Sequence, residues 1–191
     1  MEINEKNRLW IKEYFDLYKK SIFDNDVIDD IIQIKDMWLS AKKNGNKIIF
    51  AGNGGSAAMA SHCAVDLTKN AGVRAINFNE ADLITCFSND YGYEKWVEKA
   101  VEFYCDKGDT LVLISSSGNS LNIINAALVA RKMDINIITF TGFHGNNKLS
   151  DLGDINVVVN SKAYNIIEMT HHIWILSIVD MIIGKAEYSA N

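Results

Sequence analysis

The chain has no proline, only three cysteines among its 191 residues, and no excess of positive charge. The cysteines (Cys63, Cys86 and Cys105) show no C-x-x-C spacing, so we expect reduced thiols and a cytoplasmic location. The formal net charge of −5 provides no basic field, which argues against direct nucleic-acid binding. The absence of proline by itself excludes no class of function.

We also expect neither a targeting segment nor a membrane span. The first residues, Met1–Lys6, are acidic and polar, so we expect no signal peptide. The longest apolar stretch, near the C-terminus, is interrupted by His171, His172 and Asp180, so we expect no membrane span. Length and composition predict one globular domain over residues 1–191, with leading helices at about 5–44 and an α/β core at about 45–191.

Serine is concentrated in one turn. The apolar run Thr110–Ile114 predicts a buried strand, Ser115–Ser120 follows it, and a helical pattern then extends to Arg131. A helix N-terminus offers unpaired N–H groups and a partial positive charge, and hydroxyls add short donors for phosphate oxygens. The alternative is a plain serine-rich helix cap, but a cap needs one such residue and this turn supplies five around Gly118. The turn therefore predicts a phosphate site.

A second turn has similar character. Lys47–Ala51 predicts a short strand, and Gly52–Ser56 follows it before a helix rich in small residues. Glycine permits positive φ and close approach of the backbone to a ligand. The spacing fits neither G-x-G-x-x-G nor a G-K-[ST] ending, so we expect no nucleotide cofactor.

Strands and helices alternate along the rest of the chain. This order and the Val/Ile-rich strands predict an α/β fold, a three-layer α-β-α sandwich with a parallel sheet whose ligand lies at the carboxyl ends of the strands. Two leading helices, at about Asn7–Ile22 and Val27–Ala41, carry large apolar residues that indicate either a subunit interface or packing on their own sheet. The predicted strands are Lys47–Ala51, Val73–Phe78, Thr110–Ser115, Asn136–Thr141 and Ile155–Val159, and the predicted helices are Ser56–Lys69, Ala81–Ser88, Glu94–Cys105, Asn119–Met133, Lys148–Leu152 and Asn165–Ile183.

These motifs, taken in order, resemble the sugar isomerase (SIS) domain and, within it, the phosphoheptose isomerase family. The resemblance covers about residues 5–184 and is carried by Gly52–Ala58 with His62, Ser88–Tyr93, Ser115–Ser120 and Glu168–His171. It implies a five-stranded parallel Rossmann-like sheet and a homotetramer with active sites at subunit interfaces. It also implies the aldose–ketose isomerisation of sedoheptulose 7-phosphate to a heptose 7-phosphate, which feeds bacterial heptose and surface-polysaccharide synthesis.

The resemblance also implies a substrate site. The phosphate would be bound by the hydroxyl residues of the two turns, and the sugar would lie near Asn53, Gly54, Asp90 and Glu168. Read alone, Asp90 is a turn residue. The implied phosphate ligands are Ser56, Ser115, Ser116, Ser117 and Ser120.

A zinc site and the acid–base residues are implied with departures from the family. His62 matches the first zinc ligand, Asp66 stands at the position of a family Glu, and Glu168 stands at that of a family Gln. The catalytic His of the last helix is replaced by Leu176, whereas His172 lies one turn earlier on the same helical face as Glu168. We therefore expect Asp66 and His172 to be catalytic and His62, Asp66 and Glu168 to be the zinc ligands, with His172 available to complete a tetrahedral site. For each of these side chains the alternative is a satisfied core residue or a local cap.

Two other functions stay open. A non-catalytic SIS protein would bind a phosphosugar or a protein partner, similar to the DnaA initiator-associating protein, which also lacks the catalytic His. An isomerase of a different sugar phosphate would explain Asp66 and Glu168 by a new substrate. The serine-rich turn favours phosphosugar binding in each case.

Overall fold

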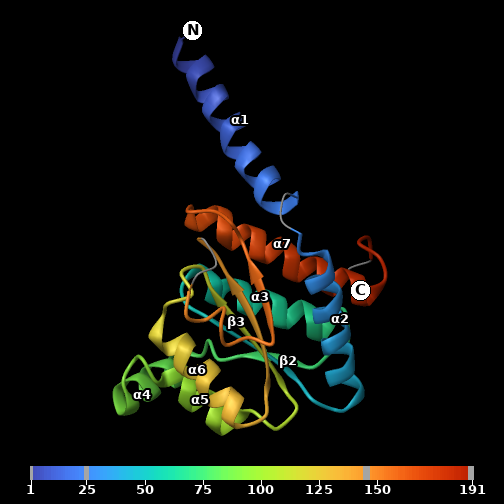
Figure 1. Cartoon of the computed structure of the whole chain (residues 1–191), viewed down its shortest axis with the longest axis vertical. Helices are drawn as coiled ribbons and strands as arrows, with labels where there is room; N and C mark the ends of the chain where they lie inside the picture. Colours follow the sequence, from blue (N-terminus) through green and yellow to red (C-terminus); the bar gives the residue numbers. More distant parts are fainter. Residues whose placement is uncertain (1, 24–25, 144–146, 189–191) are drawn as a thin grey trace.

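The computed structural model of the chain describes residues 2–23, 26–143 and 147–188. Its strands form one parallel sheet in the order β2-β1-β3-β4-β5 (Figure 1). Every neighbouring pair of strands is parallel, which confirms the predicted five-stranded parallel sheet. The strands are β1 (Ile48–Gly52), β2 (Ala75–Asn77), β3 (Thr110–Ser115), β4 (Asn136–Thr141) and β5 (Ile155–Val158).

Helices cover both faces of this sheet and produce the predicted three layers. Alternate residues of β1 point to opposite faces: Ile48 and Phe50 pack in the core beneath α2, α3 and α7, whereas Ile49 packs in the core beneath α5 and α6. Burial on both faces is why β1 and the Leu111–Ile114 part of β3 carry no polar side chains. The helices are α2 (Ile28–Lys43), α3 (Gly55–Lys69), α4 (Ala81–Tyr91), α5 (Trp96–Tyr104), α6 (Leu121–Lys132) and α7 (Tyr164–Ile183).

The strand order reverses beside β1. The chain runs from β1 to β2 on one side and then returns to place β3 on the other side. Gly52 of β1 pairs with Ile114 of β3, so the turns that follow these two strands leave the sheet next to each other. Such a reversal at the carboxyl ends of parallel strands is where α/β sheets bind ligands.

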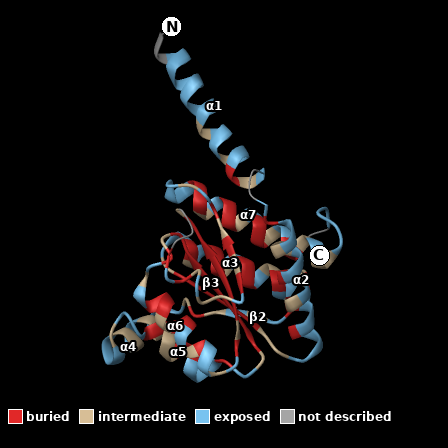
Figure 2. Cartoon of the chain, viewed as in Figure 1, coloured by how far each residue is buried: buried red, intermediate tan, exposed pale blue. Residues whose placement is uncertain are grey.

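The two leading helices differ in how they pack. α2 buries Ile34 and Trp38 in the core, and the Trp38 ring meets Phe50 edge-on at 5.7 Å. The first helix, α1 (Glu2–Phe23), projects away from the body and is exposed along most of its length (Figures 1 and 2). Packing on the sheet therefore holds for α2, and an unpartnered apolar surface is left on α1.

α7 has the length and apolar composition of a membrane span, and it is the one helix in the described ranges that does. Its apolar residues nevertheless belong to the protein core, since Ile167, Ile175 and Ile178 are fully buried against the sheet. Core packing thus accounts for the hydropathy of this helix.

One predicted element is wrong. Residues 148–152, expected to be a helix, form a series of turns instead. The Leu149 N–H donates to the Gly118 carbonyl at 3.0 Å, and the Ser150 N–H donates to the Asn147 side chain at 3.0 Å. The Leu149 amide thus holds the serine-rich turn and the Ser150 amide caps a local turn, so neither joins a helical ladder.

Candidate active site

The serine-rich turn links β3 to α6 and leaves its donors free. The Gly118 N–H closes the turn on the Ser115 carbonyl at 2.9 Å, and Gly118 adopts a φ of 61°, which favours glycine. A β-carbon at this position would also overlap the Asn147 side chain. Ser120 is the N-cap residue of α6, but its side chain makes no capping hydrogen bond. The hydroxyl and the first N–H groups of α6 therefore remain available to an anion.

The turn after β1 brings a second helix N-terminus to the same place. α3 begins after Gly54, whose φ is 56°, and this N-cap residue has no side chain with which to cap the helix. Ser56 is buried in the first turn, and its N–H donates to the Asn53 carbonyl at 3.0 Å. Two helices thus start side by side at the switch in strand order, each with its positive end toward the carboxyl edge of the sheet.

A pocket of about 140 Å³ lies between these two turns. The Ser116 hydroxyl on its wall is buried and has no hydrogen-bond partner within the described chain. Buried hydroxyls are almost always paired, so this unpaired one in a residue that lines the pocket is free to turn toward a ligand oxygen. The pocket is lined by Asn53, Ser56, Ile114, Ser115, Ser116, Ser117, Ser120, Tyr164 and Glu168. The five serines predicted to bind phosphate are therefore brought together, with Asn53 and Glu168 beside them.

Asn53 belongs to an amide network that the sequence did not reveal. Its Nδ2 donates to Asn122 Oδ1 at 3.0 Å, and Asn122 Nδ2 donates in return to Asn53 Oδ1 at 2.8 Å. The Tyr93 hydroxyl donates to the same Asn53 oxygen at 3.2 Å. This network ties the two turns together, and Asn122 is itself buried near the start of α6. Tyr164, at the start of α7, is a further pocket residue that sequence reasoning missed.

Two predicted substrate residues lie elsewhere. Gly54 is at the start of α3 but does not line the pocket. Asp90 is exposed on α4, where it accepts a hydrogen bond from Asn89 Nδ2 at 2.9 Å and one from Cys86 Sγ at 3.7 Å. Within one chain, the α4–α5 segment reaches the pocket through Tyr93 rather than through Asp90.

α3 and α7 meet along a line that we call the α3–α7 seam, defined by Gly55 against Glu168 and His62 against His172. At its first end, the Glu168 carboxylate lies so close to Gly55 that a β-carbon there would overlap it. At its second end, His172 Nε2 and His62 Nδ1 are 2.9 Å apart, and the two rings are edge-on at 4.9 Å. The pocket and the histidine pair are therefore consecutive features of one helix contact.

Asp66 extends the histidine pair. Its Oδ2 lies 3.5 Å from His62 Nε2, so His172, His62 and Asp66 form a line of titratable groups along the seam. Burial lowers the pKa of His172, the nearby His62 lowers it further, and Asp66 opposes this. A neutral imidazole at position 172 can accept a proton near neutral pH. Leu176, one turn later, packs partly against the core.

The predicted zinc ligands do not form a metal site as they are placed. Over the described ranges, no three His, Cys, Asp or Glu side chains are grouped so that they could hold one ion. Both ring nitrogens of His62 face other side chains, His172 and Asp66, whereas Glu168 lies one turn away in the pocket. The residues of one chain, as they are placed, therefore do not fit a tetrahedral zinc ion. The mechanism proposed for this chain assigns no step to a metal.

The neighbouring His171 has a different environment. Its Nε2 donates to the Thr141 carbonyl at 2.8 Å, which fixes α7 to the end of β4. Complete burial lowers its pKa to about 4. This imidazole is therefore a neutral structural group beside a histidine that faces the seam.

Comparison with known proteins gives consistent matches. The SIS domain family matches residues 13–142 of the chain. A phosphoheptose isomerase from Aliarcobacter butzleri is 44% identical over 135 residues, which cover 68% of this chain and 71% of that protein. One from Helicobacter hepaticus is 37% identical over 162 residues, covering 82% of each. The solved structure of a phosphoheptose isomerase from Neisseria gonorrhoeae is 29% identical and superposes with a TM-score of 0.84 over 94% of this chain and 98% of that one.

Proposed function

Because the chain belongs to the SIS domain family and to its phosphoheptose isomerase branch, we propose that it is an aldose–ketose isomerase that converts sedoheptulose 7-phosphate to a heptose 7-phosphate. The observation that carries the proposal is the pocket between two uncapped helix N-termini, with the unpaired Ser116 hydroxyl on its wall. A phosphate there accepts hydrogen bonds from serine hydroxyls and from backbone N–H groups of α6. It needs no lysine or arginine, because the helix termini supply the positive potential.

The length of the seam suits a long sugar phosphate. Gly55 and His62 lie on one face of α3 seven residues apart, or about 10 Å at the helical rise. With carbon–carbon bonds of about 1.5 Å, an extended seven-carbon chain has its carbonyl end about that far from its phosphorus. A substrate whose phosphate occupies the serine pocket would thus bring its first two carbons to the histidine pair.

The proposed chemistry moves one proton between neighbouring carbons. A base removes a proton from the first carbon of the ketose as the carbonyl oxygen on the second carbon takes up a proton, which gives the enediol. The hydroxyl on the first carbon then loses its proton as a proton returns to the second carbon, which gives the aldose. We assign these transfers to His172 and Asp66, connected through His62. His172 takes the part of the family His that Leu176 replaces. The net reaction consumes no proton and needs no oxidant.

Turnover of sedoheptulose 7-phosphate by the purified protein tests the proposal, with and without added zinc. Asp66→Asn is the matched variant, since it keeps the size of the side chain and removes its basicity. We expect turnover by the wild type and its loss in the variant. Equal rates in both would remove Asp66 from the mechanism. Zinc binding by His62, Asp66 and Glu168 stays a prediction that requires these side chains to rearrange, and stimulation by zinc would support it.

A non-catalytic phosphosugar-binding role is the second candidate, favoured by Leu176. It predicts binding of sedoheptulose 7-phosphate without turnover, as in a scaffold that binds a protein partner. An isomerase of another sugar phosphate predicts turnover of a different member of a panel of ketose and aldose phosphates. The same assay separates the three outcomes.

The protein is further proposed to form a homotetramer in the cytoplasm. The support is α1, whose Trp10, Phe15 and Leu17 are each about half exposed or more, on faces without a partner in the described chain. Phe15→Asp should reduce the mass measured by light scattering, and Lys132→Asp on α6 is the control. The free thiols agree with a reducing compartment. No direct contact with nucleic acid or membrane is proposed.

A further inference from the structure

The pocket proposed to bind phosphate has an acid on its wall. Among the described residues that line it, Glu168 is the one carboxyl group, and no lysine, arginine or histidine accompanies it. The pocket would bind phosphate more tightly with a neutral side chain at this position, because a carboxylate and a phosphate in one pocket repel each other. Phosphate binding alone therefore does not explain why a carboxylate lies in this pocket.

Glu168 is held at the pocket by its surroundings. Ile166 and Ile167 beside it are fully buried and fix the rotation of α7. Gly55 opposite leaves room for the carboxylate, since any β-carbon there would overlap it. Over the described ranges, its oxygens have no hydrogen-bond or ion-pair partner. Glu168 is thus an unused acceptor in a pocket whose other side chains are mainly hydroxyl and amide groups.

We propose that Glu168 is a specificity-determining residue that makes the pocket reject free tetrahedral oxyanions and accept phosphate only as the ester of a polyhydroxylated carbon chain. A free oxyanion such as sulfate presents only acceptor oxygens and negative charge to the carboxylate. A sugar phosphate presents hydroxyl groups, whose donated hydrogen bonds to Glu168 offset the repulsion. Rejection of free anions keeps the site open to substrate in a solution rich in them. This inference rests on the proposed function of the same pocket.

Calorimetric titration of the full chain with two probes, inorganic sulfate and sedoheptulose 7-phosphate, tests the inference. In Glu168→Gln, which keeps size and polarity, we expect sulfate affinity to rise about tenfold and sugar-phosphate affinity to change by less than about threefold. Glu168→Asp, which retracts the charge by one methylene, should give a sulfate affinity between those of the wild type and Glu168→Gln. Ser177→Ala, on the same helix but outside the pocket, is the control and should match the wild type for both probes.

The outcomes separate the inference from the function on which it rests. Unchanged sulfate affinity in Glu168→Gln, or an equal gain for both probes, would overturn the inference. A sulfate affinity of Glu168→Asp that is not higher than that of the wild type, or that exceeds that of Glu168→Gln, would also overturn the inference. If Glu168→Gln does not fold, the comparison of Glu168→Asp with the wild type decides whether the inference holds. A wild type that binds no sugar phosphate would reject the proposed function, while the sulfate titrations would still measure exclusion by Glu168.

Discussion

The two ends of the α3–α7 seam are made of different chemical groups. The pocket end consists mainly of serine hydroxyls, backbone N–H groups and helix termini that lie within a turn or two of the preceding strands, and α7 adds Tyr164 and Glu168. The other end depends on His62 and His172, which are 110 residues apart in sequence and meet only because α3 and α7 pack together. The serine-rich part of the pocket is thus encoded locally, whereas the proposed proton transfer depends on the alignment of two helices.

Replacement of His172 by Gln tests this division most strongly. We expect kcat to fall by about 10²–10⁴-fold, because the group that moves the proton is lost. The dissociation constant for sedoheptulose 7-phosphate should change by less than about threefold, because the pocket is untouched. Steady-state kinetics and calorimetry give the two numbers. A parallel loss of binding would show that the two ends are not independent.

A Leu176→His substitution in the His172→Gln variant tests further whether binding and proton transfer are separate. The double variant His172→Gln, Leu176→His moves the imidazole one turn along the seam, to the position that the family resemblance predicts for it. Partial recovery of kcat would show that either turn of α7 can present the proton-transferring group. No recovery would tie the activity of this chain to the contact between His62 and His172.

His171 and the adjacent His172 place a buried imidazole and an accessible one on the same helix. The pKa of His171 is about 4 in the folded protein and about 6.5 when unfolded, so its neutral form stabilises the fold above pH 6.5. Below that pH the unfolded chain takes up the proton first, and about 3 kcal/mol of the free energy of unfolding is lost as the pH falls to 4.

Chemical denaturation at several pH values measures this loss against His171→Gln, which does not titrate. The advantage of the wild type over the variant should shrink by about 3 kcal/mol between pH 7 and pH 4. A constant difference across that range would mean that His171 is not buried as a neutral group.

The serines of the pocket provide a smaller effect. Ser117→Ala or Ser120→Ala should weaken binding of sedoheptulose 7-phosphate by about 1–2 kcal/mol, since each removes one charge-assisted hydrogen bond. Ser61→Ala is a control on α3 outside the pocket, because its hydroxyl donates to the Ala57 carbonyl and accepts from Asn79 Nδ2. Unchanged binding in both pocket variants would reject the phosphate site.

The smallest expected effect lies at Tyr93. Tyr93→Phe removes the hydrogen bond to Asn53 at 3.2 Å and leaves the reciprocal amide pair with Asn122 in place. We expect binding to weaken by about 0.5–1.5 kcal/mol, as for one neutral hydrogen bond. Asn122→Ala should cost more, because it removes both amide hydrogen bonds between Asn122 and Asn53 and leaves Asn53 with only the Tyr93 hydroxyl in the link between the turns. Calorimetric titration of both variants tests this order.

The sequence was informative where structure is local. β3 and the turn after it were predicted residue by residue, because a buried strand, a serine-rich turn and a helix start each have their own pattern. Helical periodicity predicted that His172 shares a face of α7 with Glu168, but only the family resemblance implied that this face would meet His62, which lies 2.9 Å away. Residues 148–152 were mistaken for a helix, since nothing in their pattern shows that the Leu149 N–H serves Gly118.

Other features depend on contacts that no local pattern records. Asn122 and Tyr93 act through side chains from distant segments, and neither stands out in the sequence. The apolar residues of α1 and α2 look alike, yet only α2 buries its large residues in the core of its own chain. Which helix packs and which projects is decided by the whole chain.

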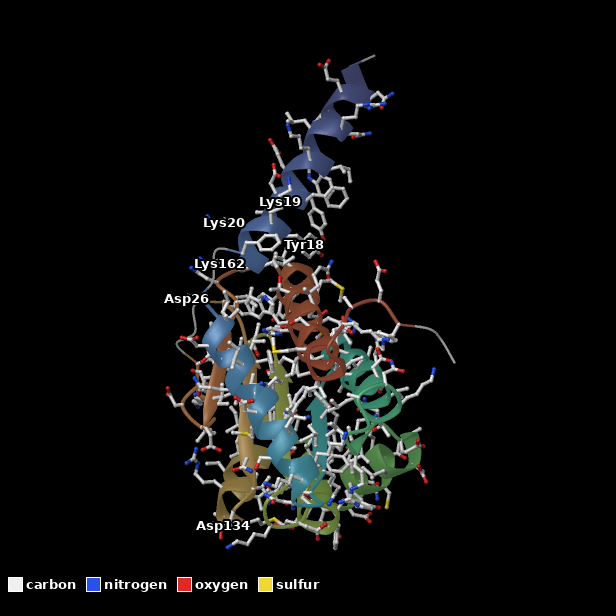
Figure 3. The ribbon with its side chains drawn as sticks, turned by 90° about the vertical axis from the view of Figure 1, so that its right-hand side faces the viewer. Tyr18, Lys19, Lys20, Asp26, Asp134 and Lys162 are labelled. Atoms are coloured by element: carbon white, nitrogen blue, oxygen red, sulfur yellow. The ribbon has the colours of Figure 1, made fainter. Side chains whose placement is uncertain are left out.

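The projecting helix has a consequence for how stability depends on dilution. α1 touches the body mainly at its base, where Tyr18 donates to the Asn165 carbonyl at 3.4 Å (Figure 3). In the proposed homotetramer, association would supply much of the free energy that keeps this projecting helix of 22 residues folded. By mass action, the temperature at which the protein unfolds should rise with its own concentration. Abundance in the cell then becomes a determinant of folding, in addition to its effect on flux.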